Sequence, residues 1–438
     1  MIRSVALVVV CLRKLWPWHL AHRHVRLNYL AGRRTCAASR RRRRVLRRCR
    51  ILADNSVSLK ARGFFLPSGF RPGGFLEVRD GVVVGVSDDP SPDLEVVDCG
   101  DATVAPGFVD THIHGYANHD FMDCDPNGNR KILDALAHKG TTSILATTLT
   151  ASTDSIDKAC AGIARTVEER PAGSPEARIQ GIFLEGPFFT EKHKGAQNPA
   201  YLCDPSLDKL RQWQQSAHGL IRKSALAPER KGSDAYVRGA AKMGVVTALG
   251  HSDATCEQGR HAVDAGASVF VHTYNGMSGL HHRMPGLVGC AMTTDNTYAE
   301  LICDGLHVMP AAADALVRAK GWSEVALVSD CLRCGGMPDG DYMLGELPIV
   351  LSGGVARLRD ENNIAGSVLT MGGAVRNIVD WGVESLEHAV AMATIVPARS
   401  AGIADRCGQI LPGRAADLVV LGADLSVRAT YVGGVLVK

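Results

Sequence analysis

Residues 104–114 read VAPGFVDTHIH and open the part of the chain that decides the fold. The apolar run 104–112 predicts a strand, and the amphipathic segment 129–139 after it predicts a helix. Seven more strand-like runs follow, at 142–148, 179–185, 220–226, 245–250, 268–272, 298–303 and 325–329. Each precedes a helix-like segment, at 154–169, 206–216, 233–243, 255–265, a poor stretch after 275, 310–320 and 370–381. Eight such units within about 270 residues predict an α/β fold, a (β/α)₈ TIM-type barrel.

The alternative fold is an open, doubly wound sheet. That fold needs a glycine-rich phosphate fingerprint directly after its first strand, and residues 112–125 contain none. Both flanks of the barrel region are β-rich, with strand-like runs at 57–61, 75–79, 82–86, 95–98, 417–421, 429–432 and 435–437. We therefore expect a small β-sandwich domain formed from both termini, residues 51–105 and 406–438, around a barrel of residues 106–405.

Residues 1–50 have a different composition from the rest. They hold fifteen Lys and Arg and no Asp or Glu, which leaves 34 basic against 45 acidic residues, a formal charge of −11, for residues 51–438. An Arg-rich start can be a nucleic-acid arm, a targeting peptide or a membrane-surface tail. The favoured interpretation is an atypical extension, disordered or translated from a mis-assigned start codon. The acidic remainder predicts no nucleic-acid partner, so an anionic substrate must meet local cations.

The spacing of the cysteines and the length of the apolar runs indicate where in the cell the protein is expected. Thirteen Cys without framework spacing predict free thiols in a reducing compartment, and hence a cytoplasmic protein. Cys331 and Cys334 form a single C-x-x-C, interpreted as two thiols in a loop. No run reaches the roughly eighteen apolar residues of a membrane span, so no membrane association is expected.

Polar side chains end the predicted strands, where barrels of this type keep their catalytic residues. His112 and His114 are two residues apart on the first strand and point to the same face. Other strand ends carry Glu185, His251, His272 and Asp330. Imidazole and carboxylate groups suit Zn²⁺ or Fe²⁺, and the missing thiolate argues against a structural zinc site. Spacing alone leaves Asp330 as either a ligand or a base beside the metal.

These motifs resemble a known family. The pattern of residues 106–114 is similar to the opening of the amidohydrolase superfamily, and residues 408–413 and 416–419 resemble the segment that closes it. Within the superfamily, the chain resembles the N-acetylglucosamine-6-phosphate deacetylases over about residues 55–438. The segments that carry this resemblance are 184–188, 194–199, 226–229, 250–252, 272–277, 304–307 and 367–371.

The resemblance implies an activity and the roles of particular residues. The activity is metal-dependent hydrolysis of N-acetylglucosamine 6-phosphate to glucosamine 6-phosphate and acetate, in amino-sugar catabolism, by a homodimer. Glu185, His251 and His272 would hold the catalytic metal, and Asp330 would be the general base and then the acid. His112 and His114 would complete a second metal site, for one or two ions of Zn, Fe, Mn or Co per subunit. The substrate-binding residues would be Ala196, Gln197, Asn275, Gly276, Arg283, Asp304, His307, Ile364, Ala365 and Gly366.

Two of these residues carry further expectations. Arg283 would bind the phosphate, across a dimer interface. Gln197 stands where family members without the His-x-His pair carry His, which favours the two-metal type.

Three alternatives stay open. The substrate can be another N-acyl hexosamine phosphate, such as N-acetylgalactosamine 6-phosphate, because Asn275-Gly276 and residues 364–366 depart from the family pattern at the sugar site. A cyclic amide is disfavoured, because such hydrolases often use a bridging Lys where Glu185 ends the strand. The chain can also be a non-catalytic amidohydrolase-like scaffold, which the complete set of candidate ligands disfavours.

Overall fold

Eight parallel strands form one sheet in the computed structural model, which describes residues 55–361 and 363–438; the predictions for residues 1–50 lie outside this range. Neighbours in the sheet follow chain order from β8 to β17. The strands are β8 (Phe108–Ile113), β11 (Thr141–Thr148), β12 (Arg178–Phe188), β13 (Ile221–Leu226), β14 (Val246–Leu249), β15 (Val269–Phe270), β16 (Tyr298–Leu301) and β17 (Val325–Leu327). The backbone amide of Asp330, just beyond β17, donates to the His112 carbonyl at 2.8 Å and closes the sheet at its carboxyl end. The predicted (β/α)₈ barrel is confirmed.

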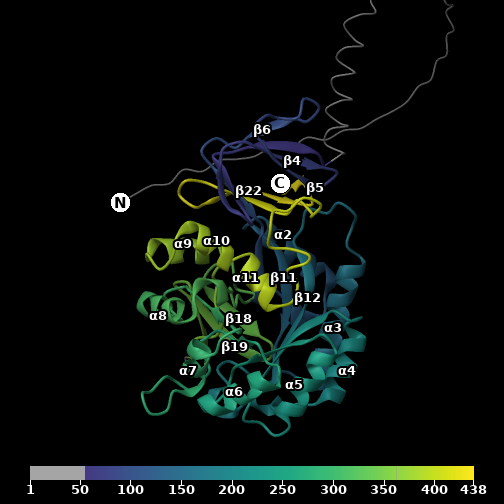
Figure 1. Ribbon diagram of the computed structural model, residues 1–438. Helices are drawn as coiled ribbons and strands as arrows, with labels where there is room; N and C mark the ends of the chain where they lie inside the picture. The colour runs from purple at the N-terminus through teal and green to yellow at the C-terminus, as the bar shows by residue number, and fades with distance from the viewer. Residues whose placement is uncertain (1–54, 362) are drawn as a thin grey trace, which may run out of the picture. The chain divides into compact units, whose positions relative to one another are not determined.

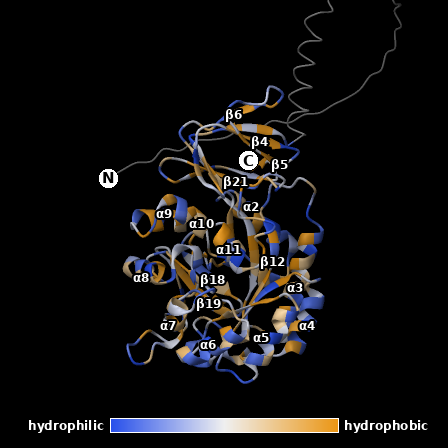
Figure 2. Cartoon of the chain, viewed as in Figure 1, coloured by the Kyte–Doolittle hydropathy of each residue, from blue (hydrophilic) through white to orange (hydrophobic). Residues whose placement is uncertain are grey.

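Helices follow the strands and lie outside the sheet (Figure 1). Several begin at a side-chain cap: the Thr255 hydroxyl, for example, accepts from the Gln258 amide at the start of α6. Figure 2 shows hydrophilic outer faces on these helices and more apolar strands inside. No described helix is long and apolar enough to cross a membrane. The helices are α2 (Pro126–Ala137), α3 (Thr153–Glu168), α4 (Leu207–Ser216), α5 (Ser233–Lys242), α6 (Cys256–Ala265), α7 (Gly286–Thr293), α8 (Pro310–Lys320), α9 (Met371–Asp380), α10 (Leu386–Met392) and α11 (Ile395–Ser400).

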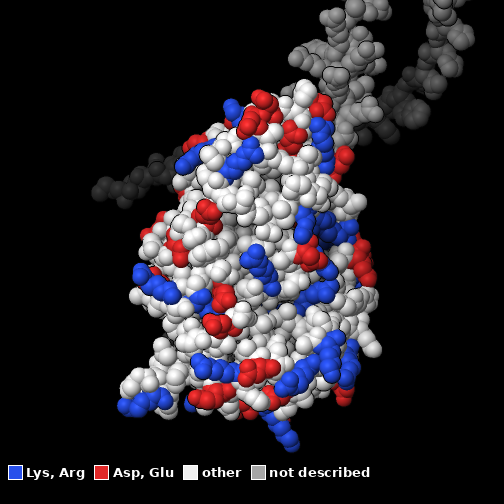
Figure 3. Space-filling view, in the orientation of Figure 1, with Lys and Arg blue, Asp and Glu red and all other residues white. Residues whose placement is uncertain are grey.

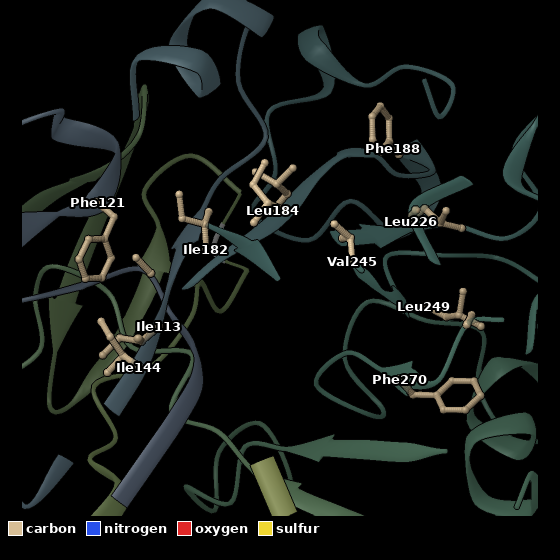
Figure 4. Close-up of a cluster of buried hydrophobic side chains, with 14 of the residues drawn as sticks. Ile113, Phe121, Ile144, Ile182, Leu184, Phe188, Leu226, Val245, Leu249 and Phe270 are labelled. Atoms are coloured by element: carbon tan, nitrogen blue, oxygen red, sulfur yellow. The ribbon is translucent and has the colours of Figure 1, made fainter. Parts of the chain in front are cut away.

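The barrel core shows how alternation along a strand aims polar groups. Ile182 and Leu184 on β12 belong to the apolar cluster shown in Figure 4, together with residues of the covering helices. Phe183, between them, belongs to a different cluster, with Val109 and Ala225 of the neighbouring strands. Because successive side chains point to opposite faces, Glu185 points to the same side as Phe183, into the barrel.

A β-sandwich is built from both ends of the described chain. One sheet has the order β5-β4-β1-β6, and the other has the order β23-β22-β21-β7-β2-β3. Apolar side chains from both sheets, including Leu59, Val104 and Leu418, form its core. The domain boundaries expected at 105 and 405 stay a prediction. The strands are β1 (Val57–Lys60), β2 (Gly63–Leu66), β3 (Gly69–Pro72), β4 (Phe75–Arg79), β5 (Val82–Ser87), β6 (Val96–Asp98), β7 (Thr103–Pro106), β21 (Leu418–Leu421), β22 (Val427–Val432) and β23 (Val435–Leu436).

The sequence predicted a single strand over residues 104–112, and this prediction is wrong. The run is divided at Gly107 into β7 of the sandwich and β8 of the barrel. A Cβ on Gly107 would lie 2.1 Å from the Thr142 hydroxyl oxygen, so glycine is needed for this close approach. The apolar run therefore contributes one strand to the sandwich and one to the barrel.

A small sheet that the sequence analysis missed lies between β17 and α9. It contains β18 (Gly340–Leu344), β19 (Leu347–Ser352) and β20 (Val355–Leu358), paired antiparallel. The Tyr201 hydroxyl donates to the Glu346 carboxylate at 2.9 Å, and the Lys194 ammonium lies 2.9 Å from Glu361. These contacts join the small sheet to the loop after β12, beside the mouth of the barrel.

A candidate metal centre and active site

Six buried side chains meet inside the barrel mouth, and they are the six that the strand ends singled out. His251, His272 and Asp330 have φ values of 47°, 29° and 49°, in the left-handed region that non-glycine residues rarely adopt. Such strain is typical of functional sites, where the surrounding structure fixes the direction of a side chain. Here it occurs just after three different strands and turns three candidate ligands towards one centre.

Glu185, His251 and His272 form the first group. Both imidazole Nε2 atoms lie 3.2 Å from Glu185 Oε1 and 3.0 Å from each other. Two ligand atoms about 2.0–2.1 Å from a tetrahedral zinc ion lie about 3.3 Å apart, so these separations fit a shared cation.

His112, His114 and Asp330 form the second group. Both imidazole Nε2 atoms lie 3.3 Å from Asp330 Oδ1, and each is also 3.3 Å from an oxygen of Glu185. The Glu185 carboxylate therefore lies between the two groups. His112 Nε2 is buried and makes no hydrogen bond to any described residue, although two carboxylate oxygens are near it. A nitrogen directed between carboxylates in this way is suited to a metal ion, and the two groups fit two ions.

The two carboxylates of the cluster raise the pKa values of the His112 and His114 imidazoles that face them. Burial would lower the pKa of His112, yet the charges of Asp330 and Glu185 raise it to about 10. Burial would raise the pKa of Asp330, but the facing His112 and His114 hold it below its ordinary value. The pKa of Glu185 is held well below its ordinary value by the same imidazoles, against its burial. The carboxylates are thus ionised, and they attract a proton or a metal cation to the imidazoles.

Two of the candidate ligands are oriented by neighbouring groups. The His251 ring donates from Nδ1 to the His193 carbonyl at 3.0 Å, which leaves its Nε2 lone pair directed at the cluster. The Gln197 amide donates to Glu185 Oε2 at 2.7 Å and accepts from the Thr150 backbone amide at 3.0 Å. Gln197 therefore fixes the carboxylate that lies between the two groups.

A cavity of about 540 Å³ opens onto this cluster. Seven of the predicted substrate-binding residues line it: Ala196, Gln197, Asn275, Gly276, His307, Ile364 and Gly366. Asp304 does not line it, but its carboxylate lies 2.7 Å from His307 Nδ1, which leaves His307 Nε2 available to a ligand. Ala365 is fully buried against the small sheet instead.

Arg283 is not brought to this cavity within one chain. It is exposed, and it lines a separate surface cavity together with Lys192 and His193. The two cavities share a wall, because the His193 carbonyl holds the His251 ring. On the face seen in Figure 3, basic and acidic side chains are intermixed, so a fixed cation for an anionic substrate has to be a particular residue.

The sequence analysis did not identify two charged residues next to the candidate metal ligands, Lys223 and Glu300. Both are fully buried and they form an ion pair with each other. Glu300 is a charged residue inside the otherwise apolar strand β16, whereas Lys223 lies on β13 between Arg222 and Ser224. The pattern on β16 is the signal that was available, because an unpaired buried charge would be very costly.

Known proteins resemble the chain over most of its length. The sequence profile of the amidohydrolase family matches residues 103–437. An N-acetylglucosamine-6-phosphate deacetylase of Vibrio furnissii is 38% identical over 78% of this chain and 85% of its own. An N-acetylgalactosamine-6-phosphate deacetylase of Escherichia coli O157:H7 is 37% identical over 86% of this chain and 98% of its own.

A solved structure is also similar to this chain. The N-acetyl-D-glucosamine-6-phosphate deacetylase of Mycobacterium smegmatis, a mutant in complex with N-acetyl-D-glucosamine-6-phosphate, is 33% identical, covers 87% of this chain and 99% of its own, and has a TM-score of 0.82. The fold, the strand-end ligands and these matches lead to one conclusion: the chain belongs to the amidohydrolase family.

Proposed function

We propose that this chain is a metal-dependent deacetylase that hydrolyses N-acetylglucosamine 6-phosphate to glucosamine 6-phosphate and acetate. One observation carries the proposal: six buried candidate ligand side chains form two groups around the Glu185 carboxylate, at a cavity lined by His307 and Asn275. A non-catalytic scaffold would have no reason to bury six polar ligand side chains together. The curated relatives whose names state this reaction support the choice of substrate.

The side chains suggest how hydrolysis proceeds. A divalent cation bound at the cluster would lower the pKa of water from 15.7 towards about 7 and polarise the acetyl carbonyl. Asp330, the ionised carboxylate of the second group, accepts a proton from the attacking water. The same carboxyl then returns the proton to the sugar nitrogen, since an amine departs poorly unless protonated. His307, held by Asp304, and Asn275 orient the sugar phosphate in the cavity.

The identity of the metal stays open among Zn, Fe, Mn and Co. Imidazole and carboxylate ligands accept all four. We propose two ions per subunit, because the candidate ligand atoms form two groups around Glu185. Position 197 is also occupied by Gln, which donates to the Glu185 carboxylate, and not by a His that could replace the His-x-His pair. A cytoplasmic location remains the expectation from the free thiols.

The second candidate substrate is N-acetylgalactosamine 6-phosphate. It is favoured by the Escherichia coli O157:H7 relative, of which the match covers 98%. Acetate release should be measured for the glucosamine and galactosamine isomers, each with and without the 6-phosphate. We expect the highest kcat/KM for N-acetylglucosamine 6-phosphate. A higher value for the galactosamine isomer would change the substrate and leave the chemistry standing, whereas no acetate from any sugar would overturn the proposed function.

We propose that Arg283 binds the 6-phosphate of a substrate held in the cavity of the partner subunit of a homodimer. A guanidinium offers phosphate a planar pair of donors, and this one is exposed. Arg283→Ala should raise KM for the 6-phosphate sugar by about ten- to 150-fold, the value of one charge-assisted contact. The kcat for the unphosphorylated sugar should change little, and steady-state kinetics on both sugars measures the difference.

Mixed dimers test the subunit arrangement. Combining Arg283→Ala with Asp330→Asn subunits should restore some activity, because one of the two hybrid sites then has both groups intact. No recovery in verified heterodimers would assign Arg283 to its own subunit. Equal losses on phosphorylated and unphosphorylated sugars would show that Arg283 does not bind phosphate.

A further inference from the structure

We propose that Glu300, neutralised by Lys223, is a positioning residue that orients the His112 ring and sets which of its nitrogens faces the metal. The inference rests on the proposed metal dependence. Neither residue belongs to the ligand groups identified among the described residues, and neither lines the cavity. Their effect on the reaction therefore passes through the ligands that they hold.

The contact with His112 sets which ring nitrogen faces the metal. His112 Nδ1 lies 3.0 Å from Glu300 Oε2, and both side chains are fully buried. An ionised carboxylate can only accept, so Nδ1 carries the hydrogen. The Nε2 atom then faces Glu185 and Asp330 at 3.3 Å from each, and its lone pair would be available to a cation that displaces the proton. A carboxylate behind a ligating histidine both orients the ring and increases its basicity.

Glu300 also contacts the other ligand group. The backbone amide of His272 donates to the same oxygen, Oε2, at 3.3 Å. The Glu300 carbonyl accepts from the Thr273 amide at 2.8 Å. One residue thus holds the ring of a ligand in one group and the backbone of a ligand in the other.

Lys223 offsets the energetic cost of burying the Glu300 carboxylate. Its ammonium forms an ion pair with Glu300 Oε1 and donates to the Thr111 carbonyl at 2.8 Å. It also lies 3.8 Å from the centre of the Phe183 ring, a cation–π contact. Because Thr111 directly precedes His112, Lys223 fixes the strand backbone while Glu300 fixes the ring. The pair therefore supports His112 from two sides.

The competing explanation is a structural ion pair in the barrel core with no effect on metal. The explanations differ in what they predict for metal affinity. We expect wild-type protein to bind two Co²⁺ ions with distinct affinities. In Glu300→Gln, the Kd of the ion held by His112 should rise about ten- to 100-fold, the usual effect of losing such a partner. The Kd of the other ion should rise less, because Glu300 contacts only the backbone amide of its ligand His272.

Metal affinity is measured by Co²⁺ titration of chelator-treated protein, followed by the visible cobalt absorption. Glu300→Asp is the second variant: it keeps the charge beside Lys223 but is one methylene too short for the 3.0 Å contact. It should show the same selective loss. Glu176→Gln is the matched control, because it breaks a largely buried pair with Arg130 away from the cluster. It should leave both cobalt affinities unchanged.

A double-variant comparison assigns the affected site. His114→Ala weakens the group that contains His112, so adding Glu300→Gln to it should have little further effect on the remaining ion. Equal affinities for wild type, Glu300→Gln and Glu300→Asp, with only a lower melting temperature, would overturn the positioning role. Wild-type protein that binds no Co²⁺ at all would overturn the proposed metal dependence itself.

Discussion

Chelation is expected to abolish acetate release, and Zn²⁺, Fe²⁺, Mn²⁺ or Co²⁺ should restore it. Without a cation, water has a pKa of 15.7 and is a poor nucleophile at neutral pH. The protein's own groups cannot replace the cation, because the four imidazoles and two carboxylates of the cluster do not lower the pKa of water as a bound divalent ion does. The loss should therefore reach the detection limit of an acetate assay.

Metal binding should also appear as stability, independently of activity. A ligand that binds only the folded state stabilises it, by about 2.7 kcal/mol at one hundred times Kd. Added Zn²⁺ should raise the melting temperature of chelated wild type and raise that of His251→Ala less, because one buried ligand is missing. Full acetate release by protein shown to be metal-free would end the metal-dependent account.

Asp330→Asn should lower kcat by about 10²–10⁴-fold and leave substrate binding largely intact. The amide keeps the size of the carboxylate and cannot accept the water proton. Asp330 has the position for this role: it lies 3.3 Å from the Nε2 atoms of His112 and His114 and lines the substrate cavity. Steady-state kinetics, with binding measured separately on the inactive variant, gives both quantities.

Two controls separate this role from other effects. Asp314→Asn changes an aspartate on α8 whose partner is Arg318, so it should retain wild-type kcat. The metal content of Asp330→Asn should also be measured, because the Asp330 carboxylate is one of the candidate ligands of the second group. A near-normal kcat in the metal-loaded variant would mean that another group handles the proton.

The barrel could be predicted from the sequence because each strand and helix carries its own local pattern. Successive side chains on β12 point to opposite faces, which directs Glu185 inward with Phe183, and the strand order follows the chain. The six candidate ligands could be predicted for the same reason, since parallel strands bring their carboxyl ends to one rim. Their distances and the bridging position of Glu185 required the structure.

Pairings between distant buried charges could not be predicted. Lys223 and Glu300 are 77 positions apart, and Glu300 is 188 positions from His112. Glu300 within the otherwise apolar strand β16 indicates that a partner exists without indicating which one. The small sheet of β18–β20 was missed because its strands carry intermediate or exposed side chains among the buried ones, which weakens the apolar signal.

Hydrolysis in ¹⁸O-labelled water tests the central claim most directly. Metal-loaded protein should convert N-acetylglucosamine 6-phosphate to equal amounts of acetate and free sugar amine. The acetate should carry one ¹⁸O atom and the sugar none, because water attacks the acetyl carbon and the C–N bond breaks. Metal-loaded protein that releases no acetate, or ¹⁸O found in the sugar instead, would contradict the account.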